Sequence, residues 1–239
     1  MAAKLELKGR HPALGLLLKA ALAALGVYLL RETSSSIAAL LLFSLVFLAI
    51  YFRPPLNNRK FLVSALSLLT LPVLLPPVTG ILEWLLLILW GIVFFLLLGV
   101  KNLIFLRRQG NYETVHILLV FSIGVLYLLG LLPLIPQILL FIALFFLVKE
   151  FYFILAPPYP QRLILAAVVE TLLLVEIAWI LSFLSINFLA GAALLALVTF
   201  IFHDLILHHF QGTLSRQIIL RNVTLFTILS ILLATLPRI

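Results

Sequence analysis

Residues 80–108 of the chain read GILEWLLLILWGIVFFLLLGVKNLIFLRR. Between positions 80 and 100 the only charged residue is Glu83, and basic residues follow at positions 101, 107 and 108. A helix needs about 20 consecutive apolar residues to cross the hydrocarbon core of a bilayer. This stretch therefore predicts a transmembrane helix that ends at a basic loop.

The same pattern recurs along the chain. Apolar residues make up 65% of the 239 and charged residues 10%, whereas a soluble domain is about half apolar and a quarter charged. We expect an all-α fold, a polytopic transmembrane helix bundle that forms one integral membrane domain over residues 1–239. About nine spans are predicted, and the pattern is compatible with eight to ten. They fall near residues 12–30, 36–52, 61–77, 80–100, 114–134, 137–155, 162–184, 188–207 and 217–236.

Basic residues collect in every second gap between these spans. Eleven lie in the N-terminal tail and in the second, fourth, sixth and eighth gaps, whereas the other gaps and the C-terminus hold only Arg31 and Arg238. Loops rich in lysine and arginine stay on the cytoplasmic side. We therefore expect the N-terminus in the cytoplasm and the C-terminus outside, in a plasma or inner membrane. The eleven are Lys4, Lys8, Arg10, Arg53, Arg59, Lys60, Lys101, Arg107, Arg108, Arg162 and Arg216.

The net charge of +8 follows from this topology. Nucleic acid is not an expected partner, because the basic residues flank apolar segments instead of forming a patch interleaved with aromatic residues. The expected partners are the lipid bilayer and a membrane protein or further copies of the chain. The sequence has no cysteine, which excludes disulfides, thiolate catalysis and cysteine-ligated metals. No cofactor is expected.

Six charged residues fall inside the predicted spans, toward their cytoplasmic ends, together with His203. A charge in the membrane costs about 2.5–3.5 kcal/mol on insertion scales, so it persists when it is paired, protonated or useful. One interpretation is a band of interhelical ion pairs that fixes the packing. The other is a polar vestibule, open to the cytoplasm, that recruits an anion or a headgroup. The six are Lys19, Lys149, Arg221, Glu150, Glu170 and Asp204.

Glu176 lies deeper than these residues, about 21 Å along the seventh span and near the middle of the membrane. It follows Glu170 by six residues, which puts the two side chains about 120° apart on a helix. We expect a buried, neutral carboxyl group that relays a proton, holds a cation or bonds to a threonine of a neighbouring helix. The candidate threonines are Thr70, Thr199 and Thr227.

The eighth span ends with His203-Asp204 and His208-His209. Asp204 and His208 are four residues apart and share a helix face, so with Glu170 they would form a three-ligand site for zinc or iron. Histidine near a membrane surface is more often an interfacial polar residue, and no metal is predicted on balance.

Three classes of function stay open. The first is a small proton- or cation-coupled transporter or permease, with a buried Glu176 and a polar layer on the cytoplasmic side. Its substrate- or proton-binding candidates are Glu176, Glu170, Asp204, His203, Arg221 and Lys149. The second is a membrane scaffold or subunit of a larger complex, whose partner would pack on the small residues 190–193.

The third class is an intramembrane enzyme that processes lipids or peptides, with Glu170, Asp204 and His208 converging. The sequence has no nucleophile elbow, phosphate-binding glycine loop, dinucleotide fingerprint or H-E-x-x-H motif. Enzymatic activity is therefore less expected than transport or a structural role.

Overall fold

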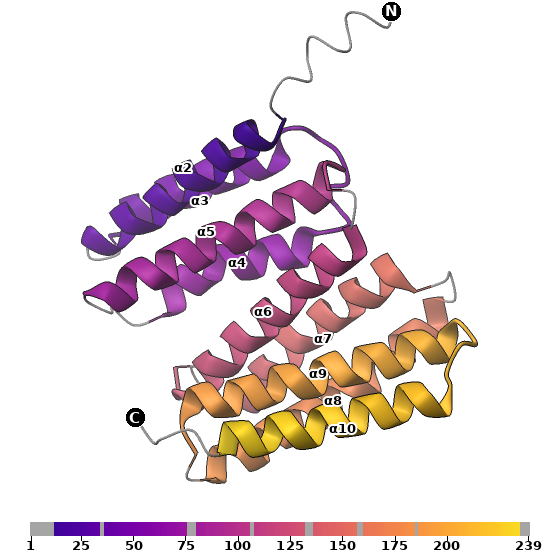
Figure 1. Ribbon diagram of the computed structural model, residues 1–239. Helices are drawn as coiled ribbons and strands as arrows, with labels where there is room; N and C mark the ends of the chain where they lie inside the picture. The colour runs from indigo at the N-terminus through magenta and orange to yellow at the C-terminus, as the bar shows by residue number, and fades with distance from the viewer. Residues whose placement is uncertain are drawn as a thin grey trace, which may run out of the picture. The chain divides into compact units, whose positions relative to one another are not determined.

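The computed structural model describes residues 12–33, 36–75, 80–105, 108–131, 136–156, 160–184 and 186–234. Within these ranges the backbone forms nine helices and no strand, so the predicted all-helical fold is confirmed (Figure 1). The helices are α2 (Pro12–Glu32), α3 (Ile37–Phe52), α4 (Leu62–Leu74), α5 (Ile81–Lys101), α6 (Arg108–Leu128), α7 (Pro136–Leu155), α8 (Pro160–Phe183), α9 (Phe188–Phe210) and α10 (Arg216–Ala234).

Seven of the described helices are long and apolar enough to cross a membrane, namely α2 and α5 to α10. The other two are apolar but shorter, with 16 residues in α3 and 13 in α4. At 1.5 Å per residue α4 is about 20 Å long, less than the hydrocarbon core of about 30 Å. The architecture is therefore consistent with a helical membrane bundle that passes the bilayer several times.

The position of α6 differs from the prediction. The helix covers residues 108–128, six residues earlier at each end than the predicted span of 114–134. Its polar first turns contain good helix formers, which an apolar window excludes. At its other end Gly130 has a φ of +69° and the Leu131 N–H bonds to the Leu126 carbonyl at 3.0 Å, which stops the helix while the sequence is still apolar.

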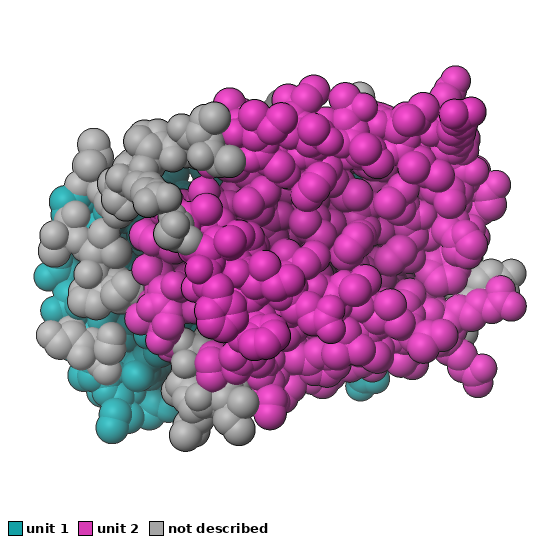
Figure 2. Space-filling view, turned by 90° about the horizontal axis from the view of Figure 1, so that it is seen from below, with its two compact units in different colours: residues 1–115 teal, residues 116–239 magenta. Residues whose placement is uncertain are grey.

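The chain divides into two compact units, residues 1–115 and 116–239, with the boundary inside α6 (Figure 2). In unit 1, α2 packs against both α3 and α5, and α4 packs against α5 and α3. Its core is aromatic: Phe47 and Phe94 have no exposed surface, and their ring centroids are 4.7 Å apart. Trp90 lies beside both rings and donates its indole N–H to the Leu68 carbonyl at 2.9 Å, which ties α5 to α4.

A buried lysine joins the ends of α3 and α5 in unit 1. Lys101, in the last turn of α5, has no exposed surface and donates to the carbonyls of Tyr51 and Pro54, the latter at 3.0 Å. Its ammonium group also lies 4.6 Å from the centre of the Tyr51 ring. A cation is favourable at a helix C-terminus because the last carbonyls there have no partner within the helix. Lys101 therefore holds the C-terminal ends of α3 and α5 together.

In unit 2, small residues let α6 and α9 approach each other closely. A Cβ atom added to Gly191 of α9 would lie 2.7 Å from the Leu128 side chain of α6. Its neighbours Ala190 and Ala192 are buried as well. The prediction that residues 190–193 present a free face to a partner is therefore wrong, because the chain's own α6 already uses this surface.

Candidate functional site

A buried carboxyl group, that of Glu170 in α8, is the centre of a polar cluster in unit 2. The Glu170 side chain is 1% exposed, and its Oε2 accepts a hydrogen bond from the Tyr152 hydroxyl of α7. Its Oε1 lies 3.1 Å from Nε2 of His203 in α9, a short contact that is poorly aligned for a hydrogen bond. Side chains from three helices thus meet at one carboxyl group, away from bulk water.

The His203 ring is held by aromatic neighbours. It stacks on Phe151 with ring centroids 3.8 Å apart and an interplanar angle of 14°, and Tyr152 approaches it edge-on at 5.5 Å. The buried ring of His116, from α6, lies 4.8 Å away. A proton can move between an imidazole and a neighbouring carboxyl group, because each group can bind one proton and the positive imidazolium and the negative carboxylate stabilise each other.

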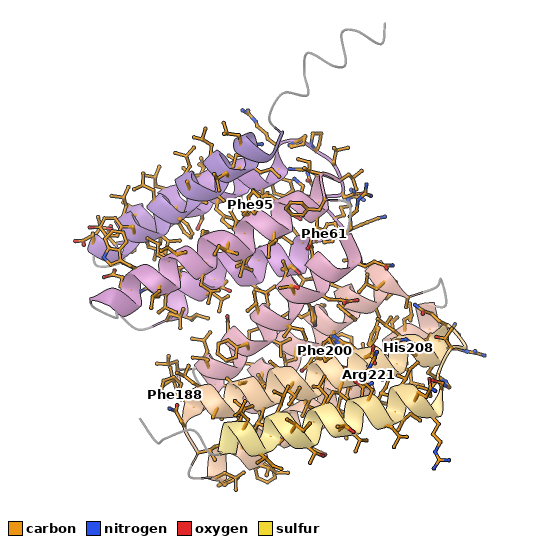
Figure 3. All side chains as sticks on the ribbon, in the orientation of Figure 1. Phe61, Phe95, Phe188, Phe200, His208 and Arg221 are labelled. Carbon is orange, nitrogen blue, oxygen red and sulfur yellow. The ribbon has the colours of Figure 1, made fainter. Side chains whose placement is uncertain are left out.

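A second cluster surrounds Asp204, the residue after His203. Its Oδ2 accepts from Arg221 Nη2 at 2.7 Å and from Asn222 Nδ2 at 2.6 Å, both of α10. Nδ1 of His208 lies 3.4 Å from the other carboxylate oxygen. Figure 3 labels His208 and Arg221, at the end of the α9–α10 pair where the connecting segment lies. Asp204 therefore anchors α10 to α9.

The structure separates the residues predicted as a metal site. Asp204 and His208 lie together, but the partners of Glu170 are Tyr152 and His203. Among the described residues there is no group of three histidine, aspartate or glutamate side chains placed to hold a metal ion. The convergence of Glu170, Asp204 and His208 on which the enzyme hypothesis depends is not found.

The two lysines of the predicted polar layer contact aromatic rings or a backbone carbonyl, and neither forms an ion pair among the described residues. Lys149 is half-buried, with its ammonium group 5.8 Å from the Phe145 ring and 6.0 Å from the Phe153 ring. Lys19, in unit 1, donates to the Arg53 carbonyl at 3.0 Å. Of the six charged residues of the predicted layer, Asp204 and Arg221 form an interhelical ion pair.

Glu176 is not buried. Its side chain is exposed on the outer face of α8, between Leu172 and Trp179, which are 49% and 50% exposed. The expected threonine partners are engaged elsewhere, because Thr70, Thr199 and Thr227 each donate to a carbonyl of their own helix. The expectation of a carboxyl group enclosed between helices was wrong at position 176, and Glu170 is the enclosed one.

Three residues of the two clusters were missed by the sequence analysis. Tyr152 and His116 carry polar groups inside long apolar helices, and their rarity there was the available signal. Asn222 stands in the pattern Asn222-Val223-Thr224, which resembles a glycosylation site, but its side chain is 1% exposed and bonded to Asp204.

No protein-family model matches the chain, and the comparisons found no matching curated protein or solved structure. Any functional conclusion therefore depends on the geometry of the two clusters and of the exposed surfaces.

Asp204→Asn is expected to loosen α10. Asn222 is the only buried residue among the described side chains of α10, so its bond to Asp204 is a large share of what holds this helix. The variant replaces an acceptor by a donor, and we expect a loss of about 1–2 kcal/mol, mostly from the buried bond because Arg221 is exposed. Limited trypsin digestion in detergent would show faster cleavage at Arg216 and Arg221.

Thr227→Val is the matched control for this experiment, because the Thr227 hydroxyl bonds only within α10 and its side chain is exposed. Equal digestion rates for Asp204→Asn and the wild-type protein would show that Asp204 does not anchor α10.

Proposed function

We propose that the chain is a multi-pass protein of a plasma or inner membrane, with nine spans and its N-terminus in the cytoplasm. The support comes from the end of unit 1 where Lys101 lies. The Lys101 and Lys19 bonds bring the N-terminal half of α2, the end of α3 and the end of α5 together at one end of the unit. The connection between α3 and α4, with Arg53, Arg59 and Lys60, therefore lies level with the basic end of α5.

If the α3–α4 connection lies on the same side of the membrane as the basic end of α5, α3 and α4 must both cross the membrane although they are short. Three basic side chains left in hydrocarbon would each cost about 2.5–3.5 kcal/mol on insertion scales. A short apolar helix is accommodated by local thinning of the bilayer at a fraction of a kcal/mol per Å. Because thinning the bilayer costs less free energy than burying three basic side chains in it, nine spans are favoured over seven.

Single cysteines test this topology cleanly because the chain has none of its own. We expect Thr33→Cys to react with a membrane-impermeant maleimide added to intact cells. Leu56→Cys and Leu214→Cys are expected to react only after permeabilisation. Labelling of Leu56→Cys from outside would mean that α3 does not cross.

We further propose that the protein is a small proton-coupled carrier whose proton-binding site is Glu170 with His203. The observation that supports this is the enclosure of a carboxyl group and an imidazole, 3.1 Å apart, by three helices. The Glu170 carboxyl group accepts a hydrogen bond from the Tyr152 hydroxyl on one oxygen, and its other oxygen faces an imidazole that can hold a proton. Tyr152 and His203 orient the carboxyl group, and His116 and the His208–Asp204 pair supply further titratable groups nearby.

Protonation changes the forces between the helices at this site. With a proton on His203 and none on Glu170, α8 and α9 are held by an ion pair in a medium of low dielectric. When Glu170 takes up a further proton, its carboxyl group is neutral beside the protonated His203, so the attraction of the ion pair is lost and only hydrogen bonds remain. A bundle whose helix contacts depend on one proton has the two states that a proton-coupled carrier requires.

Difference infrared spectroscopy of the reconstituted protein tests the proton site directly. We expect a carboxylic-acid carbonyl band that changes with pH in the wild-type protein, is absent in Glu170→Gln and shifts in Tyr152→Phe. In liposomes under an imposed potential, Glu170→Gln should also slow proton entry by about 100-fold, a typical effect of losing a proton-transfer group.

Glu176→Gln is the matched control, since it removes an exposed glutamate from the same helix. The proposal fails if the band and the proton flux are unchanged in Glu170→Gln, or if Glu176→Gln alone abolishes them.

One observation favours a second candidate function, that of a membrane subunit. Between Leu165 and Ile180 the exposed residues of α8 are apolar except for Glu176, and no hydrogen bond or ion pair of Glu176 is found within the described part of the chain. A carboxyl group that faces lipid is costly, and a hydrogen bond to another transmembrane helix relieves that cost. This face replaces residues 190–193 as the surface a partner would use.

A photoreactive phenylalanine analogue at position 172 or 179 tests the second candidate. We expect cross-linking to another membrane protein or a second copy, with the adduct lost when Glu176→Leu is added. The same analogue at position 228, on the exposed face of α10, is the control. Adducts that persist in Glu176→Leu would show that this carboxyl group does not bind a partner.

A further inference from the structure

A groove runs along the outside of unit 1 where α2 and α5 pack together. Its volume is about 690 Å³, and its lining is almost entirely apolar. Ala20, Ala24 and Gly91 contribute small side chains in the middle of the groove, where a Cβ atom added to Gly91 would meet the Ala24 Cβ at 3.5 Å. Larger side chains, such as the exposed Leu17 and Ile88, rise on either side. Phe95, labelled in Figure 3, lies at the Leu17 end.

The length of the groove suits one lipid tail. From Leu17 to Tyr28 of α2 the lining covers eleven residue steps, or about 16 Å along the helix. This is about half of a hydrocarbon core of about 30 Å, the depth that one leaflet fills. The volume is also within the range of about 300–1,000 Å³ that is usual for small-molecule sites.

The Tyr28 end of the groove is polar and aromatic. The Tyr28 ring stacks on Trp84 with centroids 5.5 Å apart and an interplanar angle of 20°. Glu32 follows Tyr28 by one turn of α2, and Glu83 precedes Trp84 in the first turn of α5, so both carboxylates fall at this end of the groove. Arg31 is in the same last turn of α2. Tyrosine and tryptophan prefer the level of the lipid headgroups, which places this end at the membrane surface.

These charges select among lipid headgroups. The two carboxylates attract an ammonium group and repel an anionic headgroup, while a single arginine matches a single phosphate. A primary ammonium donates hydrogen bonds to carboxylates, whereas a quaternary one cannot. We propose that the groove binds a zwitterionic phospholipid with a primary-amine headgroup, its tail along Ala20, Ala24 and Gly91 and its ammonium at Glu32 and Glu83.

Selective binding needs more than an apolar groove. Lipid tails are as apolar as the groove, so a tail gains no hydrophobic free energy on entering it. What distinguishes the bound lipid from bulk lipid is close packing against the small residues and the contacts of its headgroup. The proposal therefore predicts both a shape effect and a charge effect, which are measured separately.

Brominated lipid tails quench tryptophan fluorescence on contact, and Trp84 lines the groove. The chain has three tryptophans, so Trp90→Phe with Trp179→Phe leaves Trp84 as the reporter in nanodiscs. Brominated phosphatidylethanolamine, phosphatidylcholine and phosphatidylglycerol are compared in turn. We expect an apparent affinity for phosphatidylethanolamine roughly two- to tenfold above that for phosphatidylglycerol, the effect of one or two exposed ion pairs.

Two sets of variants separate charge from shape. Glu32→Gln with Glu83→Gln should abolish the preference among headgroups. Ala21→Phe, at an exposed position of the lining, should reduce the quenching by all three lipids, whereas Leu22→Phe, next to it but outside the lining, should not. Equal quenching by the three lipids in the reporter protein, or quenching insensitive to Ala21→Phe, would overturn the proposal and mean contact with bulk lipid only.

Discussion

A polar group inside an apolar bundle must be paired, because an unsatisfied donor, acceptor or charge costs more there than in water. Both units are organised around this constraint. In unit 1 the Lys101 ammonium satisfies carbonyls at the end of α3, and in unit 2 Tyr152 and His203 surround the Glu170 carboxyl group. Apolar packing alone does not distinguish one helix neighbour from another when every surface is apolar. Polar contacts therefore join α3 to α5, α8 to α7 and α9, and α9 to α10, whereas small residues let α6 approach α9 and α2 approach α5.

The clearest example is α9, which carries His203 and Asp204 side by side. Successive residues of a helix point about 100° apart. One turn of α9 therefore contacts two neighbouring helices, α8 through His203 and α10 through Asp204. Most of the apolar side chains of α10 are exposed, and in lipid they gain little by being buried. The place of α10 in unit 2 thus depends on the carboxylate of Asp204 more than on its apolar residues.

The helices could be predicted from the sequence because apolar runs of this length are typical of helices that are surrounded by lipid. Where the prediction failed, local chemistry prevailed over hydropathy, as at α6, which ends at Gly130 while the apolar run continues. The site was harder to predict. Asp204 and Arg221 were recognised as charges that need partners, but the contact of Glu170 with Tyr152 and His203 depends on how three helices are rotated. The small residues 190–193 were recognised as a packing surface, but not that α6 covers them.

Glu170 and Glu176 show why rotation was not predictable. In a water-soluble helix the polar face is exposed, so the periodicity of the sequence tells which side is buried. In α8 the residues around both glutamates are apolar except for Thr171, so the sequence pattern gives little indication of which way the helix faces. What differs is the supply of partners at the same depth: Tyr152 and His203 reach Glu170, and no described side chain pairs with Glu176. The carboxyl group that pairs with no described side chain is therefore the one that lies on the exposed face of α8.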